Sequence, residues 1–220
     1  MNLTYINPNA TEAMTRGVVE TARAALPSAR ITGLTNSLGP AAIQGPEDGA
    51  AAVPGLLGLL PEARSQGAEA IVIACFDDTG LTEANRIAGC PVLGIGQSSY
   101  VMATLLGLRF SVVTSLAVSV PVIRQNIHDQ GFDAQCVSVR ASGLPVLTID
   151  AGAPETLDRI ADEIALARAE DKAQAVVLGC AGMARFKAML EDRTGLPMID
   201  GVAASAFLAQ AALGALGRVR

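Results

Sequence analysis

Short apolar runs alternate with longer amphipathic segments along the whole chain. In the first half these runs predict strands at LTYIN (3–7), ARITGLTN (29–36), IVIAC (71–75) and PVLGIG (91–96). Short apolar runs that recur between helical patterns are typical of alternating β and α units. We therefore expect an α/β fold built around a mainly parallel sheet.

The segments between these runs predict helices. In residues 8–26, Met14, Val18 and Ala22 repeat at helical spacing. A loop rich in glycine and proline, SLGPAAIQGPEDG, follows the second predicted strand. Further helices are expected at 50–66, 82–88 and 100–107.

The second half of the chain repeats this order. Strands are expected at FSVVTS (110–115), CVSVRASG (136–143), AVVLGC (175–180) and PMIDG (197–201). Helices are expected around 120–130, at 155–170, shortly after Cys180 and in the Ala-rich segment at the end of the chain. The sequence therefore predicts two similar α/β halves.

The repeat is clearest at two cysteines. AEAIVIAC ends at Cys75 and AQAVVLGC ends at Cys180, 105 residues later, and Pro91 corresponds to Pro197 at almost the same offset. Ligands of open α/β sheets bind at the carboxyl ends of the strands, where both thiols would lie. A single cysteine at a strand end is usually a packing residue, and we interpret Cys90 and Cys136 in that way. The matched pair predicts a site in a cleft between the halves.

The composition and charge of the chain exclude some kinds of binding partner. The net charge is −5 and no run of Lys or Arg occurs, so nucleic acid and anionic membranes are not expected as partners. No apolar stretch reaches the ~18 residues of a membrane span. The first residues, MNLTYINPNA, lack the features of a secretory signal. We therefore expect a cytoplasmic protein.

The residue types present also argue against metals and cofactors. The cysteines form no CxxC pair and His128 is the only histidine, so we expect no metal site. Pyridoxal phosphate would need a lysine, and both lysines, Lys172 and Lys187, lie in polar surface stretches. GIGQSS lacks the third glycine of a dinucleotide-binding loop. The sequence predicts free thiols and no cofactor.

Several motifs resemble those of one enzyme family. They are INPN (6–9), GPAAIQG (39–45), PGLL (54–57), ACFDDTGL (74–81), GIGQSS (94–99), RFSVVT (109–114), VRASGLPVL (139–147), LGCAGM (178–183) and IDGVAA (199–204). In this order they span nearly the whole chain, and it resembles the aspartate/glutamate racemase superfamily, most closely its branch of hydantoin and allantoin racemases. CFDDTG and VRASG favour the hydantoin racemases.

The resemblance implies a fold and a reaction. The fold would be two flavodoxin-like lobes related by pseudo-two-fold symmetry, residues 1–98 plus 203–220 forming lobe 1 and 99–202 forming lobe 2. The reaction would be a cofactor-independent racemisation of 5-substituted hydantoins, in which one cysteine removes a proton as thiolate and the other delivers one as thiol. A free thiol has a pKa of about 8.5, so we expect helix N-termini after the strands to favour the thiolate.

The expected catalytic residues are Cys75 and Cys180. Residues expected to bind substrate are chosen by their position in the motifs and at strand ends: Asn7, Pro40, Phe76, Asp77, Gln97, Thr114, Ala181, Gly182 and Asp200. Some have alternative structural roles, since Asn7 precedes a proline in a turn and Asp200 can cap a helix.

Other functions stay open at this point. Relatives usually carry Ser-Ile-Glu where this chain has Ala42-Ile43-Gln44, and Glu in place of Gln97, so allantoin or an acidic amino acid are alternative substrates. A non-catalytic small-molecule binding module is a further alternative. Mainly neutral candidate residues favour a planar ring over a free amino acid. The apolar C-terminal helix predicts a homo-oligomer.

Overall fold

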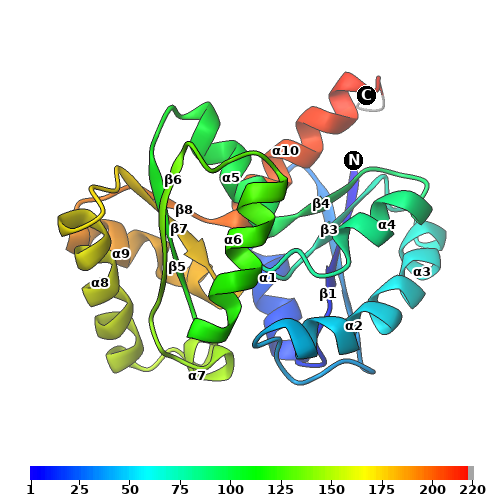
Figure 1. The fold of residues 1–220 in the computed structure, drawn as a ribbon. Coiled ribbons are helices and arrows are strands. Elements are labelled where there is room, and N and C mark those ends of the chain that lie inside the picture. The colour runs from blue at the N-terminus through cyan, green and yellow to red at the C-terminus, as the bar shows by residue number, and fades with distance from the viewer. Residues whose placement is uncertain (218–220) are drawn as a thin grey trace.

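Two four-stranded sheets form the centre of the molecule (Figure 1). The computed structural model describes residues 1–217. The first sheet has the order β2-β1-β3-β4 and the second the order β6-β5-β7-β8, and the strand pairs are parallel. This shared order is that of flavodoxin-like sheets. The predicted α/β fold of two similar lobes is confirmed.

The strands correspond closely to the apolar runs. Their bounds are Asn2–Asn7 (β1), Arg30–Thr35 (β2), Ala70–Ile73 (β3), Val92–Gly94 (β4), Phe110–Thr114 (β5), Cys136–Ala141 (β6), Ala175–Gly179 (β7) and Met198–Ile199 (β8). The central strands β3, β5 and β7 are buried throughout, because helices cover both faces of a parallel sheet. For that reason their sequences are continuous apolar runs.

The helices differ from the prediction at three places. Their bounds are Glu12–Ala25 (α1), Pro46–Gly58 (α2), Leu60–Ser65 (α3), Leu81–Ile87 (α4), Ile95–Leu105 (α5), Val120–Asp129 (α6), Val146–Ala151 (α7), Pro154–Ala169 (α8), Lys187–Thr194 (α9) and Gly201–Ala215 (α10), with 3-10 turns at Ala117–Ser119 (η1) and Ala181–Phe186 (η2). The single helix expected at 50–66 is wrong, since α2 and α3 replace it. α5 begins at Ile95 instead of residue 100, because β4 already ends at Gly94, and α7 is an additional short helix.

Proline explains the break between α2 and α3. Pro61 has no backbone N–H to continue the helical ladder. The N–H of Leu59 instead bonds to the carbonyls of Leu56 and Leu57, which ends α2. The chain then restarts as α3 with Pro61 in its first turn, a position that proline tolerates.

Each lobe sends its last helix to the other lobe. α5 follows β4 of the first sheet and packs against β7 and β8, whereas α10 follows β8 and packs against β3 and β4. The two helices also pack against each other between the lobes, as Figure 1 shows. The lobe boundaries at 98/99 and 202/203 stay a prediction.

An aromatic cluster fills the junction. The Tyr100 ring on α5 lies 5.8 Å from Phe76, 5.9 Å from Phe110 and 5.8 Å from Phe132, measured between ring centroids. Phe76 belongs to the segment after β3, whereas Phe110 is on β5, so the cluster joins segments of both lobes. Edge and stacked aromatic pairs contribute about 0.5–1.5 kcal/mol each beyond burial.

No helix within residues 1–217 is long and apolar enough to cross a membrane.

The crossing of α5 and α10 depends on a glycine. A Cβ added at Gly201 would lie 2.3 Å from the Ile95 carbonyl oxygen, whereas one added at Gly214 of the same helix would contact nothing within 4 Å. We expect Gly201→Ala to lower the free energy of unfolding by about 3 kcal/mol, because the helices must separate. Gly214→Ala should raise it by up to about 1 kcal/mol. Urea unfolding followed by circular dichroism measures both, and equal effects would contradict the close-contact explanation.

Candidate active site

The two predicted cysteines lie around one narrow cavity at the junction of the lobes. One residue, Ala74, separates Cys75 from the end of β3, and Cys180 follows β7 directly, so both stand at carboxyl ends of equivalent strands. The cavity encloses about 30 Å³. It is lined by Asn9, Met14, Ile43, Ala74, Cys75, Phe76, Asp77, Thr114, Ser115, Ser119, Val146, Gly179, Cys180 and Ala181. The tertiary fold thus brings together thiols that are 105 residues apart in sequence.

Four of the predicted substrate-binding residues line this cavity, namely Phe76, Asp77, Thr114 and Ala181. Phe76 and Asp77 follow Cys75, and Ala181 follows Cys180, so their chain position carries them to the site. Thr114 ends β5, beside β7, and its hydroxyl donates to the Gly179 carbonyl at 2.9 Å.

The other five lie outside the cavity lining. Asn7 is buried, and its amide donates to the Asn9 side chain at 2.9 Å and to the Thr15 hydroxyl at 3.1 Å, which stabilises the turn into α1. The Pro40 carbonyl accepts from the Ala10 N–H at 2.8 Å. Both residues therefore support the loop that carries Asn9.

The remaining three belong to helix starts. The Gln97 N–H, in the first turn of α5, donates to the Asp78 carboxylate. Asp200 caps α10, accepting from the N–H groups of Val202 at 2.9 Å and Ala203 at 3.2 Å. Gly182 lines a neighbouring groove instead of the cavity.

Residues absent from the predicted set complete the wall. Asn9, Ile43 and Val146 lie within the motifs INPN, GPAAIQG and VRASGLPVL, so the motifs contained a signal for them. Met14 was interpreted only as a core residue of α1. Ser115 and Ser119 carried no signal in the sequence, because they reach the cavity from the turn after β5.

The loop after Cys75 is held from both lobes. Asp78 adopts a left-handed backbone conformation (φ 50°), and its carboxylate accepts from the N–H groups of Gly96 at 2.9 Å and Gln97 at 2.7 Å. The Asn126 side chain on α6 donates to the Asp77 carbonyl at 2.8 Å. A Cβ at Gly94 would lie 1.9 Å from the Asp78 carboxylate, so only glycine fits there. These contacts fix the position of the Cys75 thiol.

Burial and charge both oppose ionisation of the thiols. Burial raises the pKa of Cys75, and the Asp77 charge raises it further, whereas the Thr79 hydroxyl donates to its sulfur at 3.5 Å and favours the thiolate. Burial raises the pKa of Cys180 to about 11. Backbone hydrogen bonds from Gly182 and Met183 lower this pKa, whereas the charge of Asp77 raises it. The thiolate must therefore be a minority form at neutral pH.

Asp77 lies in the same cavity as the two thiols. Its side chain is half-buried, and burial raises its pKa to about 7 while a hydrogen bond from Ser119 lowers it. Among the described residues that line the cavity there is no Lys, Arg or His. Arg140 is engaged elsewhere, by Glu163 at 2.7 Å, Asp171 at 2.9 Å and Glu170 at 3.0 Å. The cavity lining thus offers one acid, Asp77, one side-chain amide, Asn9, and several hydroxyls, but no cationic partner for a carboxylate.

Across the described part of the chain, no group of three or more His, Cys, Asp and Glu side chains could hold a metal ion.

Comparison with known proteins defines the class. Solved structures that share this two-lobe fold include racemases, which are isomerases, and the protein is an enzyme of this class. A family model described as Asp/Glu/Hydantoin racemase matches residues 3–209. The chain belongs to that family, within the branch of hydantoin and allantoin racemases. The resemblance predicted from the motifs is confirmed.

The similarity extends over nearly the full length of each chain. A hydantoin racemase from Rhizobium meliloti is 42% identical over 217 residues, which cover 98% of this chain and 90% of the relative. The solved structure of an allantoin racemase from Klebsiella pneumoniae has a TM-score of 0.92 at 36% identity and covers 99% of this chain and 89% of that one. An allantoin racemase from Pseudomonas fluorescens has a TM-score of 0.93 at 32% identity, covering 99% and 92%.

The hydrogen bond from Thr79 to the Cys75 sulfur should control how readily this thiol ionises. In Thr79→Val the donor is lost, and we expect alkylation of Cys75 by iodoacetamide at pH 8 to slow at least about tenfold, since a hydrogen bond to a charged group contributes about 1.5–3 kcal/mol. Thr79→Ser keeps the hydroxyl and should react at nearly the wild-type rate. Peptide mass spectrometry follows the reaction, and equal rates for both variants would show that the bond has no such role.

Proposed function

We propose that this protein interconverts the D and L forms of 5-substituted hydantoins by cofactor-independent proton transfer between two cysteines. The observation that carries the proposal is that Cys75 and Cys180 line one cavity, each from the equivalent strand end of its lobe. Two thiols that reach a stereocentre from opposite lobes can serve as acid and base in either direction.

The proposed step balances without an external reactant. One cysteine, as thiolate, removes the C5 proton, and the electron pair left on C5 delocalises onto the C4 carbonyl oxygen. The other cysteine, as thiol, gives its proton to the opposite face of C5 while the carbonyl re-forms. The first cysteine ends as thiol and the second as thiolate, which is the state required to process the opposite enantiomer.

Neutral groups of the cavity can stabilise the enolate oxygen. The Asn9 side-chain oxygen is held by the Asn7 amide and by the Thr11 N–H, each at 2.9 Å, which fixes the side chain. Its NH₂ group has only the weak Met14 sulfur at 3.6 Å as acceptor and can donate to a substrate carbonyl instead. Phe76, Asp77 and Ala181, which follow the two cysteines, line the same cavity, so their segments can supply backbone N–H donors as well. Such donors are most effective where water is excluded, and the narrowness of the cavity supports this role.

The lining supports a ring substrate over a free amino acid. A zwitterionic amino acid presents a carboxylate, for which arginine is the usual bidentate partner, and the cavity lining described above contains no cation. Asp77 would in addition repel a carboxylate. A hydantoin has two carbonyl groups and two N–H groups, which match amides, hydroxyls and an acid. Allantoin is a hydantoin with a ureido group at C5, so it is the second candidate, and the similarity to allantoin racemases supports it.

The assembly and location of the enzyme stay predictions. Exposed apolar side chains at Leu105 of α5, at Phe207 of α10 and at Leu216 support self-association through the α5–α10 side of the molecule. The sequence favours a cytoplasmic location.

Replacement of either cysteine should separate the two half-reactions. In D₂O, we expect wild-type enzyme to racemise L- and D-5-benzylhydantoin with C5–H exchange, while Cys75→Ser and Cys180→Ser each lose racemisation by at least about 100-fold, the usual contribution of a positioned acid or base. Each variant should retain exchange for a different enantiomer, because one base is left. Optical rotation and NMR measure the two processes.

The remaining cysteines provide the controls for this experiment. Cys90→Ser and Cys136→Ser carry the same chemical change outside the cavity and should keep wild-type activity. Full racemisation by Cys75→Ser or by Cys180→Ser would show that the thiol in question is only a packing residue.

The charge of Asp77 should set the pH at which the enzyme becomes active. Since this charge raises the pKa of Cys180, Asp77→Asn should lower that pKa and move the alkaline rise of kcat/KM to lower pH by about 0.5–1 unit. We expect this shift of the profile above pH 7, because Asp77 becomes protonated and loses its charge below its pKa of about 7. Asp192→Asn, with the same charge loss on the exposed side of α9, should leave the profile in place. An unchanged profile in Asp77→Asn would contradict the electrostatic coupling.

A further inference from the structure

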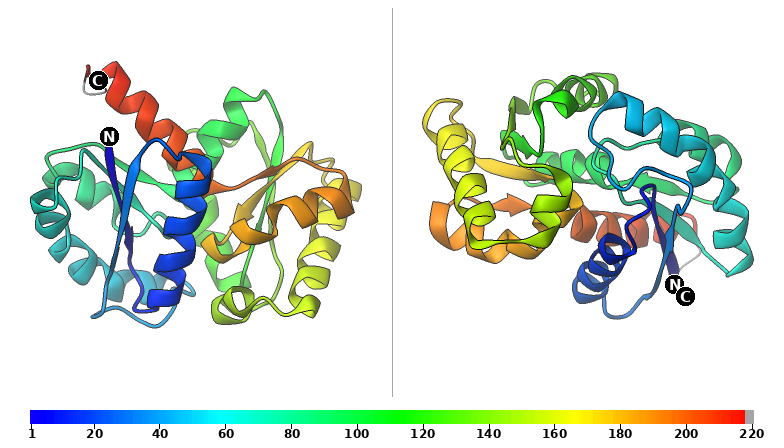
Figure 2. Two further views of the ribbon diagram at one scale, coloured as in Figure 1. Left: turned by 180° about the vertical axis from the view of Figure 1, so that it is seen from behind. Right: turned by 90° about the horizontal axis from the view of Figure 1, so that it is seen from below.

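A second, larger hollow adjoins the cavity between the cysteines. It encloses about 330 Å³ and runs between α1 of the first lobe and the α7 and η2 segments of the second. α1 packs beside η2 across the junction, as the rear view in Figure 2 shows. Met14 and Ala181 line both the cavity and this groove, so these two residues form the partition between them.

The size of the catalytic cavity makes the groove relevant to the substrate. A volume of about 30 Å³ is close to the share of one water molecule in the liquid. A hydantoin ring is larger than that, so a substrate can enter only if a wall of the cavity moves, and a substituent on C5 must extend beyond the cavity. The groove has the volume of a small-molecule site and begins at the wall of the cavity.

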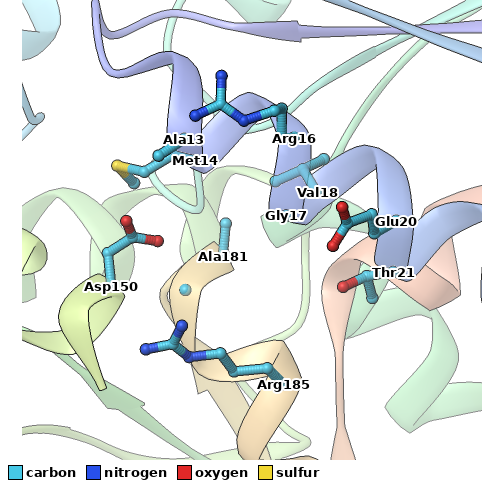
Figure 3. A pocket seen from close by; sticks show the side chains of 11 residues that line it. Ala13, Met14, Arg16, Gly17, Val18, Glu20, Thr21, Asp150, Ala181 and Arg185 are labelled. Atoms are coloured by element: carbon cyan, nitrogen blue, oxygen red, sulfur yellow. The ribbon is translucent and has the colours of Figure 1, made fainter. Parts of the chain in front are cut away.

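Small or apolar residues and charged residues of both signs line the groove together. The former are Ala13, Met14, Gly17, Val18, Ala181 and Gly182, and the polar ones are Arg16, Glu20, Thr21, Asp150 and Arg185. Figure 3 shows Arg16 and Arg185 on opposite sides of the groove, with Asp150 beside Met14. The Arg185 guanidinium is anchored by the Ile149 carbonyl at 3.2 Å and by the Phe186 ring. This mixed lining suits an uncharged substituent that has both apolar atoms and hydrogen-bonding groups.

Met14 is suited to act as a movable partition. Its side chain is buried and lies in the apolar cluster that contains Val146 and Cys180. Its sulfur accepts only a weak contact from Asn9 at 3.6 Å. Methionine has an unbranched, adaptable side chain, so rotation about its torsions can open the wall without moving α1.

We propose that Met14 is a specificity-determining residue and that the groove between α1 and η2 receives the C5 substituent of the substrate. The proposal rests on the hydantoin racemase function proposed above. It assigns to the enzyme hydantoins whose C5 substituent has a few apolar atoms and a neutral polar group.

Gly17 offers a direct test of the groove. A Cβ at Gly17 contacts nothing within 4 Å, so Gly17→Leu would fill the groove without disturbing the backbone. We expect the ratio of kcat/KM for 5-(2-carbamoylethyl)hydantoin to that for 5-methylhydantoin to fall at least about tenfold, since the loss of a few methylene contacts changes specificity by about 10–200-fold. Gly214→Leu makes the same change on α10, also in open space, and should leave the ratio unchanged.

Substitution of Met14 is a second test of the groove, with an effect expected in the opposite direction. Met14→Ala should raise the same ratio several-fold, because the wall is removed, whereas Met14→Leu keeps the volume and should change it less. Equal ratios in wild type, Gly17→Leu and Met14→Ala would overturn the groove assignment, while turnover of 5-methylhydantoin would leave the racemase function standing. A wild type that exchanges C5–H of no hydantoin in D₂O would overturn both proposals.

Discussion

The packing between the two lobes is the constraint on which the candidate site depends. Neither lobe contains both thiols, so their mutual position depends on how closely α5 and α10 cross. The approach at Gly201 leaves no space for a Cβ beside the Ile95 carbonyl, and Tyr100 joins aromatic rings of both lobes. Because each lobe donates a helix to the other, the lobes cannot separate without exposing both helices. A rigid junction of this kind keeps two reacting groups in register.

The same burial that positions the thiols makes their ionisation costly. Desolvation is the largest cause of the raised pKa of both cysteines, and Asp77 adds to it. The Thr79 hydroxyl and the N–H groups after Cys180 partly offset this effect for the thiolate. In the proposed two-base mechanism, weakly acidic thiols have a physical advantage, because each must act as acid in one direction and as base in the other. The charge of Asp77 raises the pKa of both thiols together, and under the proposed function it also disfavours anionic substrates.

Much of this arrangement could be predicted from local patterns. The apolar runs are the strands, the repeat of AEAIVIAC and AQAVVLGC reflects two sheets of identical order, and the thiols lie at strand ends as expected. Errors arose where local chemistry competed with periodicity. Pro61 divides a helix that the apolar pattern continues, and the brief VLTIDA segment was too short to be identified as α7. Asn7 and Asp200 were selected as polar residues near strand ends, yet in the folded chain their side chains bond to neighbouring backbone or side-chain groups.

The sequence by itself determined the two lobes, the pair of cysteines and the residues next to them, because strand burial and strand-end position are local properties of the chain. Only the tertiary structure decided which other side chains surround the thiols. Met14, Ile43 and Val146 come from a helix, a loop and a second short helix far apart in sequence, and they meet through packing across the junction. The groove beside Met14 likewise exists only between α1 and η2. Its shape depends on the distance and angle between two lobes, which no periodicity within one lobe encodes.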